Sequence, residues 1–386
     1  MLSGAPAGML GRSGPEHFPL AWNGLRPAER NMLRPRYADE RDTTLADTPK
    51  PVFHGGDLAA ATARFGAPAD GWLDLSTGIN PLPYRVPELS ETAWTRLPQR
   101  DREEALIAAA YRYYRVAPKA EIVPAPGTQS IIQWLPRLLA PTRVAVHGPT
   151  YGGHAAAWSD AGHTVMHVEG DGGANAADTG PHSVAIFVNP NNPDGRIQPP
   201  EKLRAAAARC AAAGGFAVID EAFADLVPEA SLAPHADAPG VVILRSVGKF
   251  FGLPGLRVGF ALGSGAPIDR LRRALGPWAV SGPALEAARA ALEDDVWIAE
   301  TRSRLVSLRT RLDGIVSEAG LEIVGGTDLF RLTRSAAAAR LHAHLGGRGI
   351  LTRNFDYDPQ TIRIGLPGSD AEFARLSQAL ASFEPG

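Results

Sequence analysis

The chain of 386 residues contains one cysteine, Cys210, so no disulfide can form within it. Cys210 lies in an alanine-rich stretch, 205–213, that is typical of a helix, and we expect its thiol to be buried and unreactive. Lysine is also scarce, since 4 lysines stand against 35 arginines. Where only positive charge is needed, this protein uses arginine. A lysine inside an apolar, glycine-rich segment, as Lys249 is, therefore indicates a need for its amine.

The sequence also lacks any run of about eighteen apolar residues that could span a bilayer. Its formal net charge is −2, with both signs spread along the chain, so no electrostatic footprint for nucleic acid or an anionic membrane is present. The first fifty residues carry no apolar core of a secretory signal. We therefore expect a cytoplasmic protein with no membrane or nucleic-acid partner, and we predict no metal site.

The length predicts one large domain and a smaller one. We interpret residues 1–50, which show no sustained hydrophobic period, as a mobile extension; Met32 is an alternative start. Residues 51–95 are predicted to form an N-terminal arm and part of the small domain. The large domain is predicted over 96–283, and the C-terminal small domain over 284–386.

From about residue 100, helical stretches such as 102–114 and 129–140 alternate with short apolar runs. The runs are 144–146, 164–168, 184–188, 217–219, 241–244 and 258–262. Such runs between helices are typical of strands buried on both faces, which predicts an α/β domain with a mainly parallel sheet. A long amphipathic stretch follows over 284–319. The C-terminal part of the chain predicts an α+β unit. It has strand-like runs at 321–324, 329–332 and 361–366, and helical stretches near 335–347 and from 370.

Three polar clusters fall at strand ends of the first domain, where open α/β sheets place their ligands. They read NPNNPDG over 189–195, VIDEAF over 218–223 and SVGKFFGLPGLRVG over 246–259. Alone, the first is typical of a turn and the second of a helix cap or a metal ligand. Together, in order and spacing, they resemble the pyridoxal 5′-phosphate site of fold-type I enzymes, in the group that contains histidinol-phosphate aminotransferases. The resemblance runs from about residue 54 to the C-terminus.

The resemblance implies a role for each residue of these clusters. Lys249 would form the Schiff base with pyridoxal 5′-phosphate, and Asp220 would pair with the pyridine nitrogen. Asn192 would donate to the 3′-oxygen of the ring, while Ser246 and Arg257 would bind the cofactor phosphate.

Other positions match the same pattern. In PGTQS, Gly127, Thr128 and Gln129 stand before a helix whose N-terminal N–H groups can bind phosphate. Tyr151 matches the aromatic residue that stacks on the cofactor. Arg363 matches the arginine that binds a substrate α-carboxylate, and Arg353 fits a second anion-binding position.

Departures from the aminotransferase pattern narrow the reaction. Phe223 stands where a tyrosine is usual, and Leu97 replaces the tyrosine of a Tyr-Pro pair that reaches across a dimer. FHGGD over 53–57 and LDLSTGINPL over 73–82 resemble the threonine-phosphate decarboxylases of cobalamin biosynthesis. In that interpretation His54 helps to bind the substrate phosphate, and Asn80 lies near the substrate.

The resemblance thus implies decarboxylation of L-threonine O-3-phosphate to 1-aminopropan-2-ol phosphate, in a homodimer. An aminotransferase of histidinol-phosphate type is the alternative, because the rotation about the Cα–N bond decides which bond breaks, and sequence does not reveal that rotation. A cofactor-binding regulator is a third hypothesis. Residues 1–50, however, offer no helix-turn-helix pattern or basic patch.

Overall fold

The computed structural model describes residues 55–169 and 183–384. Their centre is a seven-stranded sheet in the order β2-β8-β7-β6-β5-β3-β4. All neighbouring pairs are parallel except the two that involve β8. The strands are β2 (Glu121–Ala125), β3 (Arg143–Gly148), β4 (Thr164–Glu169), β5 (Val184–Val188), β6 (Phe216–Asp220), β7 (Val241–Ser246) and β8 (Gly259–Gly263). The predicted α/β domain with a mainly parallel sheet is confirmed.

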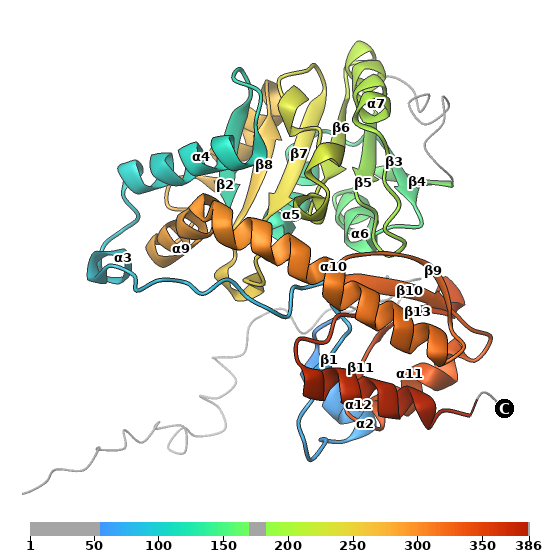
Figure 1. The fold of residues 1–386 in the computed structure, drawn as a ribbon. Coiled ribbons are helices and arrows are strands. Elements are labelled where there is room, and N and C mark those ends of the chain that lie inside the picture. The colour runs from blue at the N-terminus through green and yellow to red at the C-terminus, as the bar shows by residue number, and fades with distance from the viewer. Residues whose placement is uncertain (1–54, 170–182, 385–386) are drawn as a thin grey trace, which may run out of the picture. The chain divides into compact units, whose positions relative to one another are not determined.

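Helices cover both faces of this sheet, as Figure 1 shows. Alternate side chains of β6 enter different cores: Ile219 packs in one cluster and Val218 in the other. The first core contains residues of α4 (Arg100–Tyr114), α7 (Pro200–Ala212) and α9 (Gly282–Glu293). The second contains residues of α5 (Thr128–Arg137), α6 (Gly152–Asp160) and α8 (Ala266–Leu275). This two-sided burial is the reason why strands such as β5 and β6 read as continuous apolar runs. The prediction of burial on both faces was wrong for β4, which lies at the edge of the sheet and is only partly buried.

Two sequence predictions of helices and strands need correction. The stretch 284–319 is two helices, α9 and α10 (Asp295–Glu318), because the Asp294 side chain caps the second by accepting from the Trp297 N–H at 2.9 Å. Strand β2 had no counterpart in the prediction, because Pro124 interrupts its short apolar run.

Cys210 is buried, and burial raises the pKa of its thiol, as expected for an unreactive cysteine.

The C-terminal elements form a four-stranded antiparallel sheet in the order β12-β13-β10-β9. Its strands are β9 (Glu322–Thr327), β10 (Phe330–Arg334), β12 (Arg353–Phe355) and β13 (Asp358–Gly365), accompanied by α11 (Ala338–Gly346) and α12 (Asp370–Ala381). The N-terminal segment contributes α2 (Leu58–Phe65), α3 (Glu91–Thr95) and β1 (Leu73–Asp74), and β1 pairs in parallel with β11 (Ile350–Leu351). The exact domain boundaries stay a prediction.

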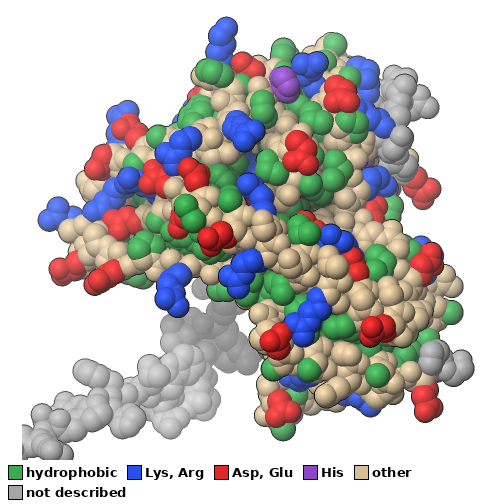
Figure 2. Space-filling view, viewed as in Figure 1, with side chains coloured by type: hydrophobic (Ala, Val, Ile, Leu, Met, Phe, Trp, Pro, Cys, Tyr) green, Lys and Arg blue, Asp and Glu red, His purple; other side chains and the backbone are tan. Residues whose placement is uncertain are grey.

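The surface has mixed charge. On the face drawn in Figure 2, basic and acidic side chains are interspersed over the described elements. In the described ranges no helix combines the length and the apolar character that a membrane crossing requires.

Candidate active site

Most of the predicted site residues lie at one edge of the seven-stranded sheet. Strands β2, β3, β5, β6 and β7 point the same way, so their carboxyl ends meet at this edge. The segments that follow them carry the side chains, as does the short connection that enters β8. In chain order these residues are Gly127, Thr128, Gln129, Tyr151, Asn192, Asp220, Ser246, Lys249 and Arg257. Ligands of open α/β sheets bind at such an edge.

Lys249 lies in the connection between β7 and β8. Its Nζ makes no hydrogen bond or ion pair with any residue that the structure describes, and it lies 5.8 Å from the ring centroid of Phe223. Burial lowers the pKa of Lys249 to about 8, and the positive charges of Arg363 and Arg257 act in the same direction. A lysine with such a pKa has a much larger uncharged, reactive fraction near neutral pH than an ordinary lysine.

Asp220 ends β6 and is buried beside a histidine that the sequence interpretation missed. The Nε2 atom of His154, on α6, lies 2.9 Å from Oδ2 of Asp220, and both side chains are almost fully buried. The N–H of Ala222 also donates to Asp220, through Oδ1. His154 follows Tyr151 by three residues, so one helical turn places both beside the carboxylate. That spacing is the signal that could have identified it.

Tyr151 precedes the first residue of α6 and packs edge-on against His154, with ring centroids 6.0 Å apart. Its hydroxyl donates to Oε1 of Gln129 at 3.0 Å. Burial, and then the negative charge of Asp220, raise the pKa of Tyr151 to about 12, so the phenol stays protonated. The ring of Tyr151 and the carboxylate of Asp220 therefore both contact His154, and stacking of Tyr151 on the cofactor stays a prediction.

A cradle for an anion surrounds the start of α5. Gly127 has φ +80°, and a Cβ there would collide with Nη2 of Arg257, so the guanidinium lies directly against the glycine backbone. A Cβ at Gly259 would likewise collide with the backbone nitrogen of Thr128. Ser246 is buried at the end of β7, and its Oγ accepts from the N–H of Gly248 at 3.2 Å. Free N–H groups of a helix N-terminus beside an arginine fit a phosphate.

Arg363, on β13, joins the C-terminal sheet to this edge. It donates from Nη1 to Oδ1 of Asn192 at 2.5 Å and from Nη2 to the carbonyl of Ser76 at 2.6 Å. Its Nε is buried without a hydrogen-bond partner among the described residues, so one donor is left for a ligand. Burial, and then the charge of Arg353, lower the pKa of Arg363 to about 10.

Arg353, at the start of β12, is the second cation of this region. Burial lowers its pKa, and its guanidinium carbon lies 5.4 Å from the ring centroid of Phe355. Because the charge of Arg353 destabilises that of Arg363, an anion bound beside both would relieve the repulsion. The structure thus brings together the two arginines that the sequence suggested for substrate binding.

Two further sequence predictions concern the N-terminal segment. Asn80 is buried against the lysine segment: its Nδ2 donates to the carbonyl of Phe250, and its Oδ1 accepts from the N–H of Leu82. These bonds, with the one from the Asn80 N–H to the Lys249 carbonyl, attach Asn80 to the backbone of the lysine segment. Direct contact of Asn80 with substrate stays a prediction. His54 lies outside the described residues. The nearby Gly56 donates its N–H to Oγ of Ser76 at 2.8 Å, and Ser76 is the residue whose carbonyl Arg363 binds.

Phe223 occupies the position at which the aminotransferase pattern has a tyrosine with its hydroxyl. Its ring packs edge-on against Phe330 with centroids 5.3 Å apart, and only 3% of Phe223 is exposed. This packing gives the Lys249 amine an apolar neighbour. Among the described residues, no group of three or more His, Cys, Asp or Glu side chains is placed to hold a metal ion.

Comparison with known proteins identifies a family and several proteins that this chain resembles over most of its length. The family model described as aminotransferase class I and II matches residues 72–380. A "Threonine-phosphate decarboxylase" of Sinorhizobium sp is 45% identical over 336 residues, which cover 86% of this chain and 99% of that protein. A protein of the same name from Pseudomonas aeruginosa is 43% identical over 335 residues, 86% of this chain and 98% of that protein.

A solved structure shares the fold. The histidinol-phosphate aminotransferase of Sinorhizobium meliloti, determined in complex with pyridoxal-5′-phosphate, superposes with a TM-score of 0.71 at 22% identity, covering 90% of this chain and 98% of that one. The expected fold-type I architecture is therefore confirmed.

Proposed function

This chain belongs to the aminotransferase class I and II family, and we propose that it decarboxylates L-threonine O-3-phosphate with pyridoxal 5′-phosphate as cofactor. The product would be (R)-1-aminopropan-2-ol phosphate, for cobalamin biosynthesis. The observation that carries the proposal is the identity of 45% and 43% with two proteins named threonine-phosphate decarboxylase, over almost their whole lengths.

The residues at the sheet edge fit the cofactor. Lys249 would bind its aldehyde covalently, and the anion cradle of Gly127, Thr128 and Arg257 would hold its phosphate. The carboxylate of Asp220 would hold a proton on the pyridine nitrogen, and His154 would orient that carboxylate. When bound, the cofactor accepts the electron pair that a broken bond at the substrate Cα leaves behind.

The chain's own side chains would select the bond that breaks. Arg363 would bind the substrate carboxylate through its free Nε, and Arg353, together with His54, would bind the substrate phosphate. Two anion contacts on different substituents fix the rotation of the amino acid, so that one Cα bond stands perpendicular to the cofactor plane. If that bond leads to the carboxylate, CO2 leaves and a proton must replace it at Cα. Lys249, with a pKa of about 8, can hold that proton near neutral pH.

Two substrates separate this proposal from the aminotransferase alternative. The purified protein with cofactor would be given threonine phosphate, and released CO2 would be measured. It would then be given histidinol phosphate with 2-oxoglutarate, and glutamate would be measured. We expect CO2 from the first mixture. We expect no glutamate above background from the second. Glutamate without CO2 would overturn the decarboxylase proposal.

A matched pair of lysine variants tests for an enzyme rather than a cofactor-binding regulator. Lys249→Ala should remove both the cofactor absorbance and the CO2 release, because Lys249 supplies the amine that would bind the cofactor aldehyde. Lys119→Ala, at an exposed position, should leave both unchanged. Cofactor absorbance in the wild type without turnover of either substrate would favour the regulator.

We also propose that the partner is a second copy of this chain. Trp94, Leu97 and Trp278 are 69%, 60% and 56% exposed, an unusual amount for large apolar side chains. They flank the contact between α3 and α9, where a Cβ at Gly282 would collide with the carbonyl of Ala93. Light scattering of the wild type should give the mass of a dimer, and Trp94→Asp should shift it towards the monomer. A wild-type monomer at all concentrations would contradict this.

A further inference from the structure

A buried ionic cluster lies directly behind two of the cofactor residues. Glu221 follows Asp220 at the end of β6, and Arg245 precedes Ser246 on the adjacent strand β7. Arg245 donates from Nη1 to Oε2 of Glu221 at 2.8 Å and from Nη2 to Oδ1 of Asp225 at 2.5 Å. The exposed fractions of Arg245, Glu221 and Asp225 are 3%, 0% and 1%.

The remaining hydrogen bonds of the Glu221 carboxylate go to one short segment. Its Oε1 accepts from the N–H of Leu232 at 2.6 Å, and its Oε2 also accepts from the hydroxyl of Ser231 at 2.5 Å. The guanidinium carbon of Arg245 lies 4.2 Å from the ring centroid of Tyr114, on α4. The planar fork of the arginine is therefore held in one orientation by two carboxylates and an aromatic face.

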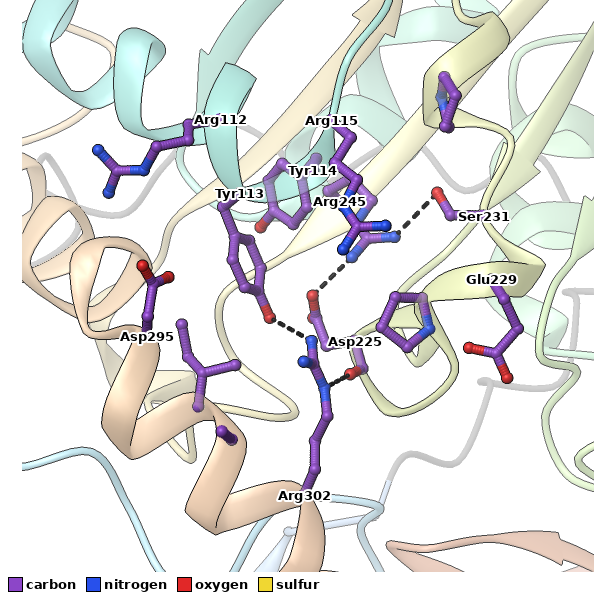
Figure 3. A pocket seen from close by; sticks show the side chains of 14 residues that line it. Arg112, Tyr113, Tyr114, Arg115, Asp225, Glu229, Ser231, Arg245, Asp295 and Arg302 are labelled. Atoms are coloured by element: carbon purple, nitrogen blue, oxygen red, sulfur yellow. Dashed lines mark hydrogen bonds and ion pairs between the residues drawn. The ribbon is translucent and has the colours of Figure 1, made fainter.

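The cluster borders a cavity of about 440 Å³ that Figure 3 shows from close by. Arg302 reaches into it from α10 and donates from Nε to the carbonyl of Asp225 at 2.8 Å. The same guanidinium lies over the ring of Phe250, 5.5 Å from its centroid, and Phe250 is the residue after Lys249. The cluster is thus joined to Asp220 and Ser246 by single peptide bonds. Its link to Lys249 is less direct and runs through Arg302, which contacts both Asp225 and Phe250.

Successive side chains of a strand point to opposite faces. Arg245 and Ser246 therefore face different sides of β7, and any rotation of the strand end that moves one moves the other. We propose that Arg245, Glu221 and Asp225 are positioning residues of the cofactor site, an inference that rests on the proposed function. By tying the ends of β6 and β7 together, they keep Asp220 and Ser246 directed at the same bound cofactor.

Glu221→Gln tests this, because it preserves shape but removes the charge that pairs with Arg245. The full-length protein would be freed of cofactor and titrated with pyridoxal 5′-phosphate, with the dissociation constant read from absorbance. The melting temperature of the cofactor-free protein would be measured beside it. We expect the dissociation constant to rise by about tenfold or more, the range found when a group that orients a binding residue is removed. Arg245→Lys, which keeps charge but loses the fork, should act in the same direction.

A matched control comes from another ion cluster of the same chain. Asp313 accepts from Arg331 at 2.5 Å and from Arg309 at 3.0 Å. It lies on α10 and not at the sheet edge that carries the candidate active site. Asp313→Asn should lower the melting temperature while the cofactor dissociation constant stays at the wild-type value.

Several outcomes would overturn the inference. If Glu221→Gln folds, melts at a lower temperature and binds the cofactor as tightly as the wild type, the cluster only stabilises the fold. If Glu221→Gln does not fold, Ser231→Ala removes one hydrogen bond from Glu221 and replaces it in the titration. An unchanged dissociation constant in that milder variant also overturns the inference, and a raised one supports it. If the wild type itself binds no cofactor, the proposed function fails first.

Discussion

The imidazole of His154 and the carboxylate of Asp220 form a buried pair, with Nε2 and Oδ2 2.9 Å apart. The other ring nitrogen of His154 has no hydrogen-bond partner among the described residues. The histidine is therefore committed to the carboxylate, and its removal would leave a buried charge without that donor.

His154→Leu should lower CO2 release from threonine phosphate by about 10- to 100-fold, because an unpaired Asp220 loses its orientation. His154→Gln, whose amide nitrogen can donate from a similar position, should recover part of the loss. The buried His163, which follows the C-terminal end of α6 and bonds the carbonyl of Pro136, supplies the control. His163→Gln should reduce the melting temperature without changing the rate. Full activity in His154→Leu would show that the pair is dispensable.

The lowered pKa of Lys249 predicts how cofactor capture depends on pH. The nucleophile is the uncharged amine, and burial shifts its pKa from 10.5 to about 8. The rate at which cofactor-free protein acquires the lysine–cofactor absorbance should rise with pH and level off above about pH 8. Arg363→Gln should move the midpoint to higher pH, because the charge of Arg363 also lowers this pKa. A rate that keeps rising to pH 10.5 would refute the shift.

Arg363→Lys should lower kcat/KM for threonine phosphate by about 10- to 100-fold. A lysine can replace one of the bonds to Asn192 and Ser76 but not the planar fork, and a lost hydrogen bond to a charged group is worth about 1.5–3 kcal/mol. Steady-state CO2 release measures the effect. Arg331→Lys, in the ion cluster on β10, is the control and should leave kcat/KM unchanged. Equal kinetics for both variants would contradict a role of Arg363 in substrate binding.

Phe223→Tyr should shift the pH midpoint of the cofactor absorbance to lower values. A hydroxyl that donates to the ring oxygen of the cofactor favours the form in which that oxygen is negative. The new hydroxyl is also buried near Phe330, so the melting temperature should fall if no partner is found. Phe187→Tyr buries a hydroxyl at a different place, beside His147, and should destabilise without moving the midpoint. An unmoved midpoint in Phe223→Tyr would mean that the hydroxyl cannot reach the cofactor.

Gly326 and Gly314 should respond in opposite ways to alanine. Gly326, at φ +140° on β9, donates its N–H to the carbonyl of Asp194 at 2.8 Å, and a Cβ there would overlap the carbonyl oxygen of Phe330. Gly326→Ala should therefore destabilise the protein and loosen the loop that carries Asn192. Gly314 lies inside α10, and an added Cβ there would meet no atom within 4 Å, so Gly314→Ala should stabilise the protein by about 0.5–1 kcal/mol. Thermal unfolding measures both changes.

Hydrophobic periodicity was sufficient to predict six of the seven strands of the large sheet. Strands β5 to β8 are buried along their whole length and need uninterrupted apolar runs, whereas β4, at the edge, is only partly buried. The motifs around Asn192, Asp220 and Lys249 were equally readable, since each follows a strand directly and parallel strands end at one edge. The family resemblance then assigned chemistry to those positions. Strand β2 escaped because its five residues include Pro124. The break at Asp294 escaped because one capping residue interrupts an otherwise continuous amphipathic pattern.

Contacts between distant segments were decided only by the tertiary structure. His154 meets Asp220 across 66 residues, Arg363 meets Asn192 across 171, and Arg363 meets Ser76 across 287. No local period encodes such pairs, because they depend on strand order and on the docking of the C-terminal elements. The same holds for the lowered pKa of Lys249, which arises first from burial and then from the charge of Arg363, on a strand of the C-terminal sheet. The sequence by itself determined the strands and the residue types at their ends. Packing decided which of those side chains act on one another.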